Sequence, residues 1–215
     1  MADNYLERRY DEVFGKQATT APKPALHPGH SLDALLLRNR SCRGYDKAFI
    51  VSREMLQRII AVNAKTPSAR NQQVLRFRPI TRGPEADEVL RHIRMGGALP
   101  ELHLPLAGTE PEAFIIVCST VPENRNVDID LGISLQSMLL KATDMGLNGL
   151  IICSFDKEAI SHALCLPYAP LAVVAIGKGA EQIRLVPIKE TESHAYYRQD
   201  GIHCVPKVQV SDLLI

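Results

Sequence analysis

The chain has 215 residues, of which 46% are hydrophobic and 23% charged, and its formal net charge is only +1. This length lets one medium-sized domain bury a full core without disulfides or a structural metal, and the composition is ordinary for a soluble protein. The near-neutral charge provides no field to attract nucleic acid or an anionic membrane. The absence of Trp, with only 5% aromatic residues, also argues against a base-stacking surface.

The five cysteines are odd in number and form no CxxC pair. Reduced thiols explain this pattern better than a disulfide framework or a zinc site. The first residues are charged and carry no apolar signal core, and no apolar run approaches the roughly 18 residues of a membrane span. We therefore expect a cytoplasmic protein with no bound metal.

Residues 1–30 are predicted to form an arm outside the main domain. An amphipathic helix is expected over 4–14, because its apolar residues fall on one face. The polar, Pro/Gly-rich stretch over 15–30 is typical of a linker. Residues 31–215 would then form a single domain.

Five elements are predicted in the next part of the chain: a short helix over 32–37, a helix over 53–64, a strand over 74–81, a helix over 84–95 and a buried strand within 112–120. Ser52 is a typical helix N-cap, and Pro84 favours the start of a helix. The run AFIIVC is typical of a strand that is covered on both faces.

A long apolar helix is predicted over 127–145, where Gly146 ends it. Apolar residues surround it almost completely, which indicates a buried helix rather than a surface helix. At about 1.5 Å per residue it would span roughly 28 Å. We expect its burial to continue across a subunit interface.

The last third of the chain is predicted to hold a strand over 150–152, a helix over 157–164, a strand over 171–176 and an extended segment after Tyr196. Asp156 would cap the helix. Strands and helices are mixed without a strict βαβ rhythm, which favours an α+β fold with helices packed on one mixed sheet.

A cluster of cations and a hydroxyl follows the first of these helices. Arg40, Ser41 and Arg43 place two guanidinium groups and one hydroxyl within four residues. Guanidinium forks match the geometry of phosphate, and a Ser hydroxyl can complete the site. These residues are candidates for a phosphate site, and the simpler alternative is a solvated turn.

A second segment, residues 67–73, combines small residues with two amides. Asn71 and Gln73 can each donate and accept hydrogen bonds. Such amides suit the alternating C=O and N–H groups of a flavin pyrimidine ring. Taken alone, the segment also fits an ordinary polar turn after a helix.

A third segment, residues 146–156, combines a tight turn, a strand and a capped helix. It would place the backbone N–H groups from Cys153 to Phe155 near a helix N-terminus. Such groups can stabilise negative charge on an electron-rich ring. The alternative is an ordinary connection between a strand and a helix.

Together and in this order, the three segments resemble the FMN-dependent nitroreductase family. The matching patterns are RS-x-R-x-[FY], PS-x-x-N-x-Q, a long apolar helix and GL-x(n)-FD. The resemblance extends from about residue 32 to residue 210. The ending from Tyr196 to Lys207 is also similar to the tail of a subgroup of that family.

This resemblance implies a three-layer α+β fold, in which a mixed β-sheet is flanked by helices, with a long buried central helix and an extended C-terminal arm. It also implies a homodimer with FMN bound at the subunit interface. Arg40, Ser41 and Arg43 would bind the phosphate and ribityl region of FMN. Lys207 from the C-terminal segment would join them at the phosphate.

The resemblance also assigns the flavin ring to the other two segments. Asn71 would face the pyrimidine edge, from the same or the other subunit, supported by Ser68 and Gln73. Cys153 and Ser154 would supply backbone contacts near the redox edge of the flavin.

Three positions depart from the family pattern. Asn39 stands where the family usually has another Arg, so the phosphate site would be weaker or would use Arg38 or Arg70 instead. Val74 replaces the usual Pro, and Cys153 stands where a Gly or an acidic residue is common.

Other motifs give no competing chemistry. The two histidines of His27-Pro-Gly-His30 are expected in a solvated loop, and the other five histidines are expected as single surface or core residues. Residues 177–182 lack the third glycine of a dinucleotide fingerprint. Cys42 lies beside two arginines that could lower its pKa, but no His base is near it in sequence, so nucleophilic catalysis is not expected.

The sequence therefore predicts an FMN-dependent oxidoreductase with NADH or NADPH as electron donor and no catalytic side chain of its own. Its ping-pong reaction would reduce nitroaromatics, quinones or related small-molecule acceptors, because the cofactor carries the chemistry. One alternative keeps the fold with a specialised flavin reaction. The other is a non-enzymatic FMN-binding or interaction protein with a degenerate active site.

Overall fold

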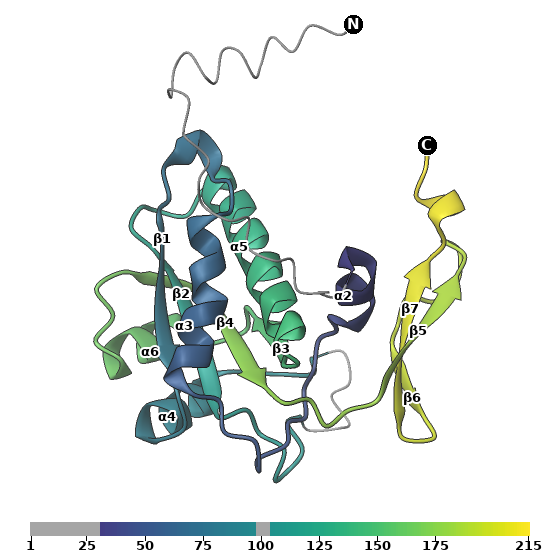
Figure 1. Ribbon diagram of the computed structural model, residues 1–215, viewed down its shortest axis with the longest axis horizontal. Helices are drawn as coiled ribbons and strands as arrows, with labels where there is room; N and C mark the ends of the chain where they lie inside the picture. The colour runs from purple at the N-terminus through teal and green to yellow at the C-terminus, as the bar shows by residue number, and fades with distance from the viewer. Residues whose placement is uncertain (1–30, 98–103) are drawn as a thin grey trace, which may run out of the picture.

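The computed structural model describes residues 31–97 and 104–215 (Figure 1). The predicted helix over 4–14, the linker over 15–30 and the His27/His30 pair lie outside these residues. The helices are α2 (Leu32–Arg38), α3 (Arg53–Ile60), α4 (Pro84–His92), α5 (Arg125–Asp144) and α6 (Lys157–Ala163), with short 3₁₀ turns at Ala61–Ala64, Ala69–Asn71 and Val210–Asp212.

Side-chain caps fix the starts of two predicted helices. The Ser52 hydroxyl accepts the backbone N–H of Met55 at 3.3 Å, at the start of α3. The Asp156 carboxylate accepts the N–H of Ala159 at 2.9 Å, at the start of α6. Both caps satisfy backbone donors that a helix leaves without a partner, as predicted.

Helix α4 ends at His92, three residues before its predicted end. Ile93 is already extended and pairs with Phe155 in an isolated antiparallel bridge. The bridge is closed by the Arg94 N–H on the Ser154 carbonyl at 2.9 Å and by the Asp156 N–H on the His92 carbonyl at 2.9 Å. Pairing with a distant segment therefore ends this helix before the two glycines do.

The main sheet has four strands, namely β1 (Leu75–Ile80), β2 (Ala113–Ser119), β3 (Asn148–Ile152) and β4 (Ala169–Gly177). Their order is β1-β2-β4-β3, and each neighbouring pair is antiparallel. All four were predicted as strands. The central strands β2 and β4 are almost completely buried, as expected for strands covered on both faces.

Helices cover both faces of this sheet, which gives three layers (Figure 1). On one face, Ala86 and Val89 of α4 and Ile160 of α6 pack with alternate residues of β2 and β4. On the other face, Leu56 of α3 and Met138 of α5 pack with the intervening residues of those strands. Because successive strand residues point to opposite faces, one apolar strand supplies both cores. The predicted α+β, three-layer architecture is confirmed.

Within this chain, α5 is buried on one face only. Leu135 and Met138 lie in the core, but Ile129 on the opposite face is 50% exposed. The sheet, α2 and α3 therefore leave part of α5 uncovered in the single chain, and the expectation that its burial continues across a subunit interface stays a prediction. Neither α5 nor any other helix in the described part of the chain is long and apolar enough to cross a membrane.

The C-terminal segment forms a second, smaller sheet from β5 (Ile183–Ile188), β6 (Tyr197–Gln199) and β7 (Ile202–Val208). Strand β7 lies in the centre, parallel to β5 and antiparallel to β6. This sheet stands away from the main sheet on the side of α2 (Figure 1). The predicted extended arm is thus a three-stranded mixed sheet, which we call the arm sheet.

The loop after α2 joins the two sheets. Ser41 forms a parallel bridge with Gly149 of β3, and the Cys42 N–H donates to the Gly149 carbonyl at 3.1 Å. Tyr45 pairs with Gly179, just before the arm sheet. A side chain at Gly149 would collide with Leu139 of α5 and with a carbonyl of β4, so glycine permits the close packing of α5 and β4 against β3.

Candidate functional site

The first predicted segment lines a cavity of about 300 Å³ between the main sheet and the arm sheet. The loop after α2 contributes Arg40, Ser41 and Arg43, and β7 contributes Lys207. The other lining residues are Asn39, Gln136, Leu139, Ile151, Tyr196, His203 and Val205. We call this the cation cavity. The four residues that the sequence assigned to a phosphate therefore lie together, although they are up to 167 positions apart in the chain.

The electrostatics of the cation cavity are one-sided. Three of its lining side chains are cations, and no Asp or Glu is among the described residues that line it. The guanidinium of Arg40 donates to the Leu36 carbonyl at 2.6 Å, and burial lowers the pKa of this group. A cavity with several cations and no anion attracts an anionic ligand.

Several buried polar atoms at the cavity have no hydrogen-bond partner among the described residues. They are Nε of Arg40, Nε of Arg43 and Nδ1 of His203. The Arg43 guanidinium lies over the Tyr196 ring, 5.2 Å from its centroid, and His203 meets the same ring edge to face at 5.1 Å. Such unsatisfied groups are uncommon in folded proteins and indicate a missing polar partner.

The substitute cations considered for Asn39 lie elsewhere. Asn39 itself lines the cation cavity. Arg38 donates to the Thr143 carbonyl at 3.3 Å, near the C-terminal end of α5. Arg70 is exposed in the turn between α3 and β1. Neither arginine is among the residues that line the cation cavity in this chain.

The second predicted segment forms a tight turn beside the N-terminal half of α5. The Ser68 hydroxyl accepts the Gln73 N–H at 3.1 Å, and the Gln73 amide donates to the Asn71 side-chain oxygen at 3.1 Å. Arg70, Asn71 and Gln73 all have positive φ, and the Ala69 N–H is held by the buried Asp130 carboxylate at 2.8 Å.

These amides do not line the cation cavity of the same chain. Ser68 and Gln73 line a different cavity of about 200 Å³, and Asn71 is exposed beside them. In one chain, the structure therefore separates the first predicted segment from the second. A ligand that contacts both segments therefore cannot do so from within the cation cavity of one chain alone.

The third predicted segment follows β3. Ile151 of this strand lines the cation cavity, and Cys153 follows directly after the strand ends at Ile152. Cys153 and Ser154 are exposed. Ser154 lines a separate cavity of about 380 Å³, together with Arg94 and Phe155. Among the described residues, the backbone N–H groups of Ser154 and Phe155 donate to no carbonyl.

The comparison with known protein families decides the affiliation of the chain. A sequence profile of the nitroreductase family matches residues 36–178, which is more than half of the chain. The chain belongs to the nitroreductase family. Among curated proteins, no sequence matches it.

Solved structures share the fold of this nitroreductase-family chain. One is a nitroreductase family protein from Clostridium difficile 630, with 23% identity, a TM-score of 0.54, and coverage of 68% of this chain and 83% of that chain. A second, from Desulfovibrio desulfuricans, is assigned as a nitroreductase in complex with FMN, with 23% identity, a TM-score of 0.57, and coverage of 75% and 89%. A third, from Staphylococcus epidermidis, is assigned as an NAD(P)H:FMN oxidoreductase, with 20% identity, a TM-score of 0.57, and coverage of 71% and 88%.

Sequence reasoning missed one central residue of this family member. His203 was expected to be an isolated surface or core histidine, but it is only 4% exposed and lies in the wall of the cation cavity. Burial and the neighbouring Arg43 lower its pKa, and Glu181 acts in the opposite direction. Its place beside Tyr196 in the family-like tail was the only signal in the sequence that could have identified it.

The Cys42 thiol does not behave as an activated nucleophile. It is buried, and it donates to the Gly44 carbonyl at 3.1 Å. Burial, together with the nearby Glu181 carboxylate, raises the pKa of Cys42 to about 11. The possibility that its two arginine neighbours lower this pKa is therefore wrong, because burial and the Glu181 carboxylate decide it.

Proposed function

We propose that this chain is an FMN-dependent oxidoreductase that takes electrons from NADH or NADPH and passes them to a small acceptor such as a nitroaromatic or a quinone. The observation that carries the proposal is the cation cavity, where Arg40, Arg43 and Lys207 meet and none of the described lining residues is Asp or Glu. Membership of the nitroreductase family and the FMN in the Desulfovibrio structure support the same cofactor.

The residues of the cation cavity fit the phosphate end of FMN. A phosphate monoester has about two negative charges at neutral pH and three strong acceptor oxygens. Arg40, Arg43 and Lys207 would neutralise this charge, and the Ser41 hydroxyl would donate to one oxygen. The unpartnered nitrogens of Arg40 and Arg43 are the groups that such an acceptor would satisfy.

The ring end of FMN would follow β3 away from the phosphate. A cavity of about 300 Å³ is at the lower limit for ligand pockets, so it holds only part of the cofactor. In this proposal, Cys153 and Ser154 contact the redox edge through their backbone groups. Ile151 covers one side of the ligand and excludes water.

A homodimer would bring the second segment to the same cofactor. Asn71, supported by Ser68 and Gln73, would reach the pyrimidine edge from the other subunit, since it lies away from the cation cavity of its own chain. The exposed apolar residues that a partner subunit could cover include Leu37 of α2, Ile129 of α5 and Leu214. Burial of such side chains stabilises association.

Bound FMN would supply the electron-transfer chemistry, and the side chains of the protein would bind it, orient it and exclude water. No general acid or base is assigned among the side chains for that reason. The five free cysteines are consistent with a reducing compartment, and we propose a cytoplasmic location.

The decisive experiment is an absorbance spectrum of the purified protein, followed by chromatography of the cofactor released by heat. Yellow-flavin bands and released FMN would support the proposal. A colourless protein that also fails to bind added FMN would refute it.

Turnover distinguishes the two alternatives. NADH or NADPH oxidation with a quinone or a nitroaromatic acceptor is expected. Bound flavin without this turnover would favour a specialised flavin reaction or a non-enzymatic FMN-binding protein. The first positions to change back to the family pattern would then be Asn39, which lines the cation cavity, and the exposed Cys153.

The dimer has its own test. Light scattering coupled to gel filtration should give a mass of about twice the 23.8 kDa of the chain. A monomer that nevertheless binds FMN tightly would refute the role of Asn71 from the other subunit.

A further inference from the structure

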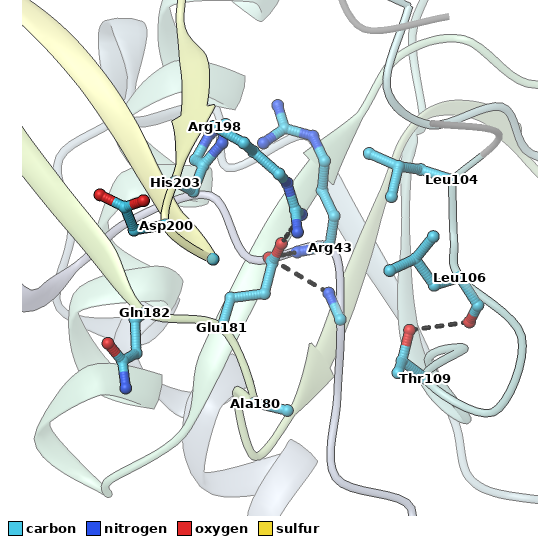
Figure 2. Close-up of a pocket in the computed structure, with 12 residues that line it drawn as sticks. Arg43, Leu104, Leu106, Thr109, Ala180, Glu181, Gln182, Arg198, Asp200 and His203 are labelled. Carbon is cyan, nitrogen blue, oxygen red and sulfur yellow. Dashed lines mark hydrogen bonds and ion pairs between the residues drawn. The ribbon is translucent and has the colours of Figure 1, made fainter. Parts of the chain in front are cut away.

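A second cavity lies on the other side of Arg43 and has an acidic residue at its centre. It measures about 330 Å³ and is bordered by Arg43, Glu181, Arg198 and His203, with Leu104 and Leu106 on the opposite wall (Figure 2). Arg43 and His203 therefore form a wall between this cavity and the cation cavity. Glu181 is on the far side of that wall from the proposed phosphate position.

The carboxylate of Glu181 accepts three hydrogen bonds from two separate elements. One oxygen accepts the backbone N–H of Arg43 at 2.5 Å and the backbone N–H of Gly44 at 3.2 Å. The other oxygen accepts Nη2 of Arg198, in β6, at 2.5 Å. Figure 2 shows the carboxylate between the loop and the Arg198 guanidinium. The Glu181 side chain is only 11% exposed, so water competes little for these contacts.

Backbone hydrogen bonds converge at the same place. The Ala180 N–H donates to the Gly44 carbonyl at 3.0 Å, and the His203 N–H donates to the Gln182 carbonyl at 2.8 Å. Residues 180–182 are thus bonded to the loop that carries Arg43 on one side and to β7 on the other. Strand β7 also carries Lys207.

In these contacts both oxygens of the Glu181 carboxylate are bound by donors of the protein itself. Its negative charge faces the backbone N–H of Arg43, whereas the Arg43 guanidinium lies over Tyr196 and has no ion pair among the described residues. A carboxylate that accepts backbone N–H groups fixes a loop without neutralising the side chains that the loop presents. This arrangement keeps the cation of Arg43 available to the cation cavity.

We propose that Glu181 is a positioning residue for the cation cavity. It fixes the backbone of Arg43 and Gly44 and, through Arg198, locks the arm sheet that carries Lys207 to the same point. The phosphate-binding part of this inference rests on the proposed function, but the fixing of the loop does not. Replacement of Glu181 should therefore disturb the loop directly and the anion affinity as a consequence.

Three variants separate the contact of Glu181 with the loop from its ion pair with Arg198. Glu181→Ala removes all three hydrogen bonds. Glu181→Gln keeps one neutral acceptor for the loop N–H groups but loses the ion pair, and Arg198→Met loses only the ion pair. The matched control is Glu85→Ala, which removes the exposed ion pair to Arg78 elsewhere on the molecule.

The first readout is hydrogen exchange at the Arg43 and Gly44 amides in the flavin-free protein. Loss of a charge-assisted acceptor should speed exchange by roughly tenfold in Glu181→Ala. Arg198→Met should stay close to the wild type, as should the control, and Glu181→Gln, which keeps a neutral acceptor, should fall between them and Glu181→Ala. Unchanged exchange in Glu181→Ala would refute the inference. If that variant does not fold, equal FMN affinity in Glu181→Gln, Arg198→Met and the wild type would refute it instead.

The second readout is FMN affinity, measured by flavin fluorescence on the same proteins. Glu181→Ala should weaken binding by about tenfold, and Glu181→Gln and Arg198→Met should each give a smaller loss, because both remove the ion pair but leave an acceptor for the loop. Faster amide exchange with unchanged FMN affinity would show that Glu181 stabilises the loop without affecting the ligand, and would refute the positioning role. Failure of the wild type to bind FMN would refute the proposed function, whereas the exchange result would still decide whether Glu181 fixes the loop.

Discussion

Replacement of Arg43 by Ala tests the cation cavity most directly. The Arg43 guanidinium lines the cavity, lies over Tyr196 at 5.2 Å and donates no hydrogen bond to another described residue. Its backbone N–H is held by Glu181, and this contact survives the change to Ala. The substitution therefore removes the charge and leaves the loop in place.

The expected loss follows from the type of contact. A charge-assisted hydrogen bond to phosphate contributes about 1.5–3 kcal/mol, which corresponds to a roughly 10- to 150-fold increase in the Kd for FMN. Arg43→Lys should fall between the wild type and Arg43→Ala, because Lys keeps the charge but loses the planar fork and the contact with the Tyr196 ring.

The assay is a fluorescence titration of the flavin-free protein with FMN and, separately, with riboflavin. Arg53→Ala, at the exposed start of α3, removes the same charge away from the cavity and should bind FMN like the wild type. A change of less than twofold for Arg43→Ala would refute the assignment of the cavity to FMN. An equal loss for riboflavin would show that Arg43 contacts the ribityl chain or ring and not the phosphate.

The remaining predictions concern other residues of the same region. Lys207→Ala should reduce the preference for FMN over riboflavin, but less than Arg43→Ala does, because Lys207 is more exposed; an unchanged preference would contradict this. The lowered pKa of His203 means that the unfolded chain binds its proton more readily than the folded chain, so this group lowers stability as pH falls below about 6.5. Between pH 7.5 and 5.5 the Tm of the wild type should therefore fall more than that of His203→Gln, and parallel curves would exclude the effect. At pH 7.5, iodoacetamide should alkylate the exposed Cys153 before Cys42, whose pKa of about 11 leaves little thiolate; mass spectrometry showing the reverse order would contradict the burial of Cys42.

Local sequence signals were sufficient for most of the main layers. Ser52 and Asp156 each mark a helix start through a bond to a residue three positions later, so the information lies within one turn of chain. The run from Ala113 to Cys118 is apolar at every position, and only a strand covered on both faces buries such a run.

The errors arose where distant contacts decide the outcome. The apolar composition of α5 indicated a buried helix but not what covers each of its faces, and Ile129 remains exposed in the single chain. The arm sheet was predicted only as an extended segment. Its centre is a parallel pairing of β5 with β7, which local alternation does not show, and Pro187 within β5 hides the strand further.

In the candidate site, too, local signals in the sequence were found and distant contacts were missed. Arg40, Ser41 and Arg43 were found because they are neighbours in sequence. Glu181 was missed because its partner Arg43 is 138 positions away and nothing near Glu181 in sequence indicates the contact. Their meeting is a property of the folded chain alone.

The bridge between Ser41 and Gly149 has a consequence for aggregation. Strand β3 is at the edge of the main sheet, where unpaired backbone groups can recruit a strand from another molecule. The loop that carries Arg40 and Arg43 covers part of this edge through Ser41 and Cys42. The loop that would bind an anion therefore also covers this edge of the sheet. If the loop were loosened, β3 would be open to edge-to-edge pairing between molecules.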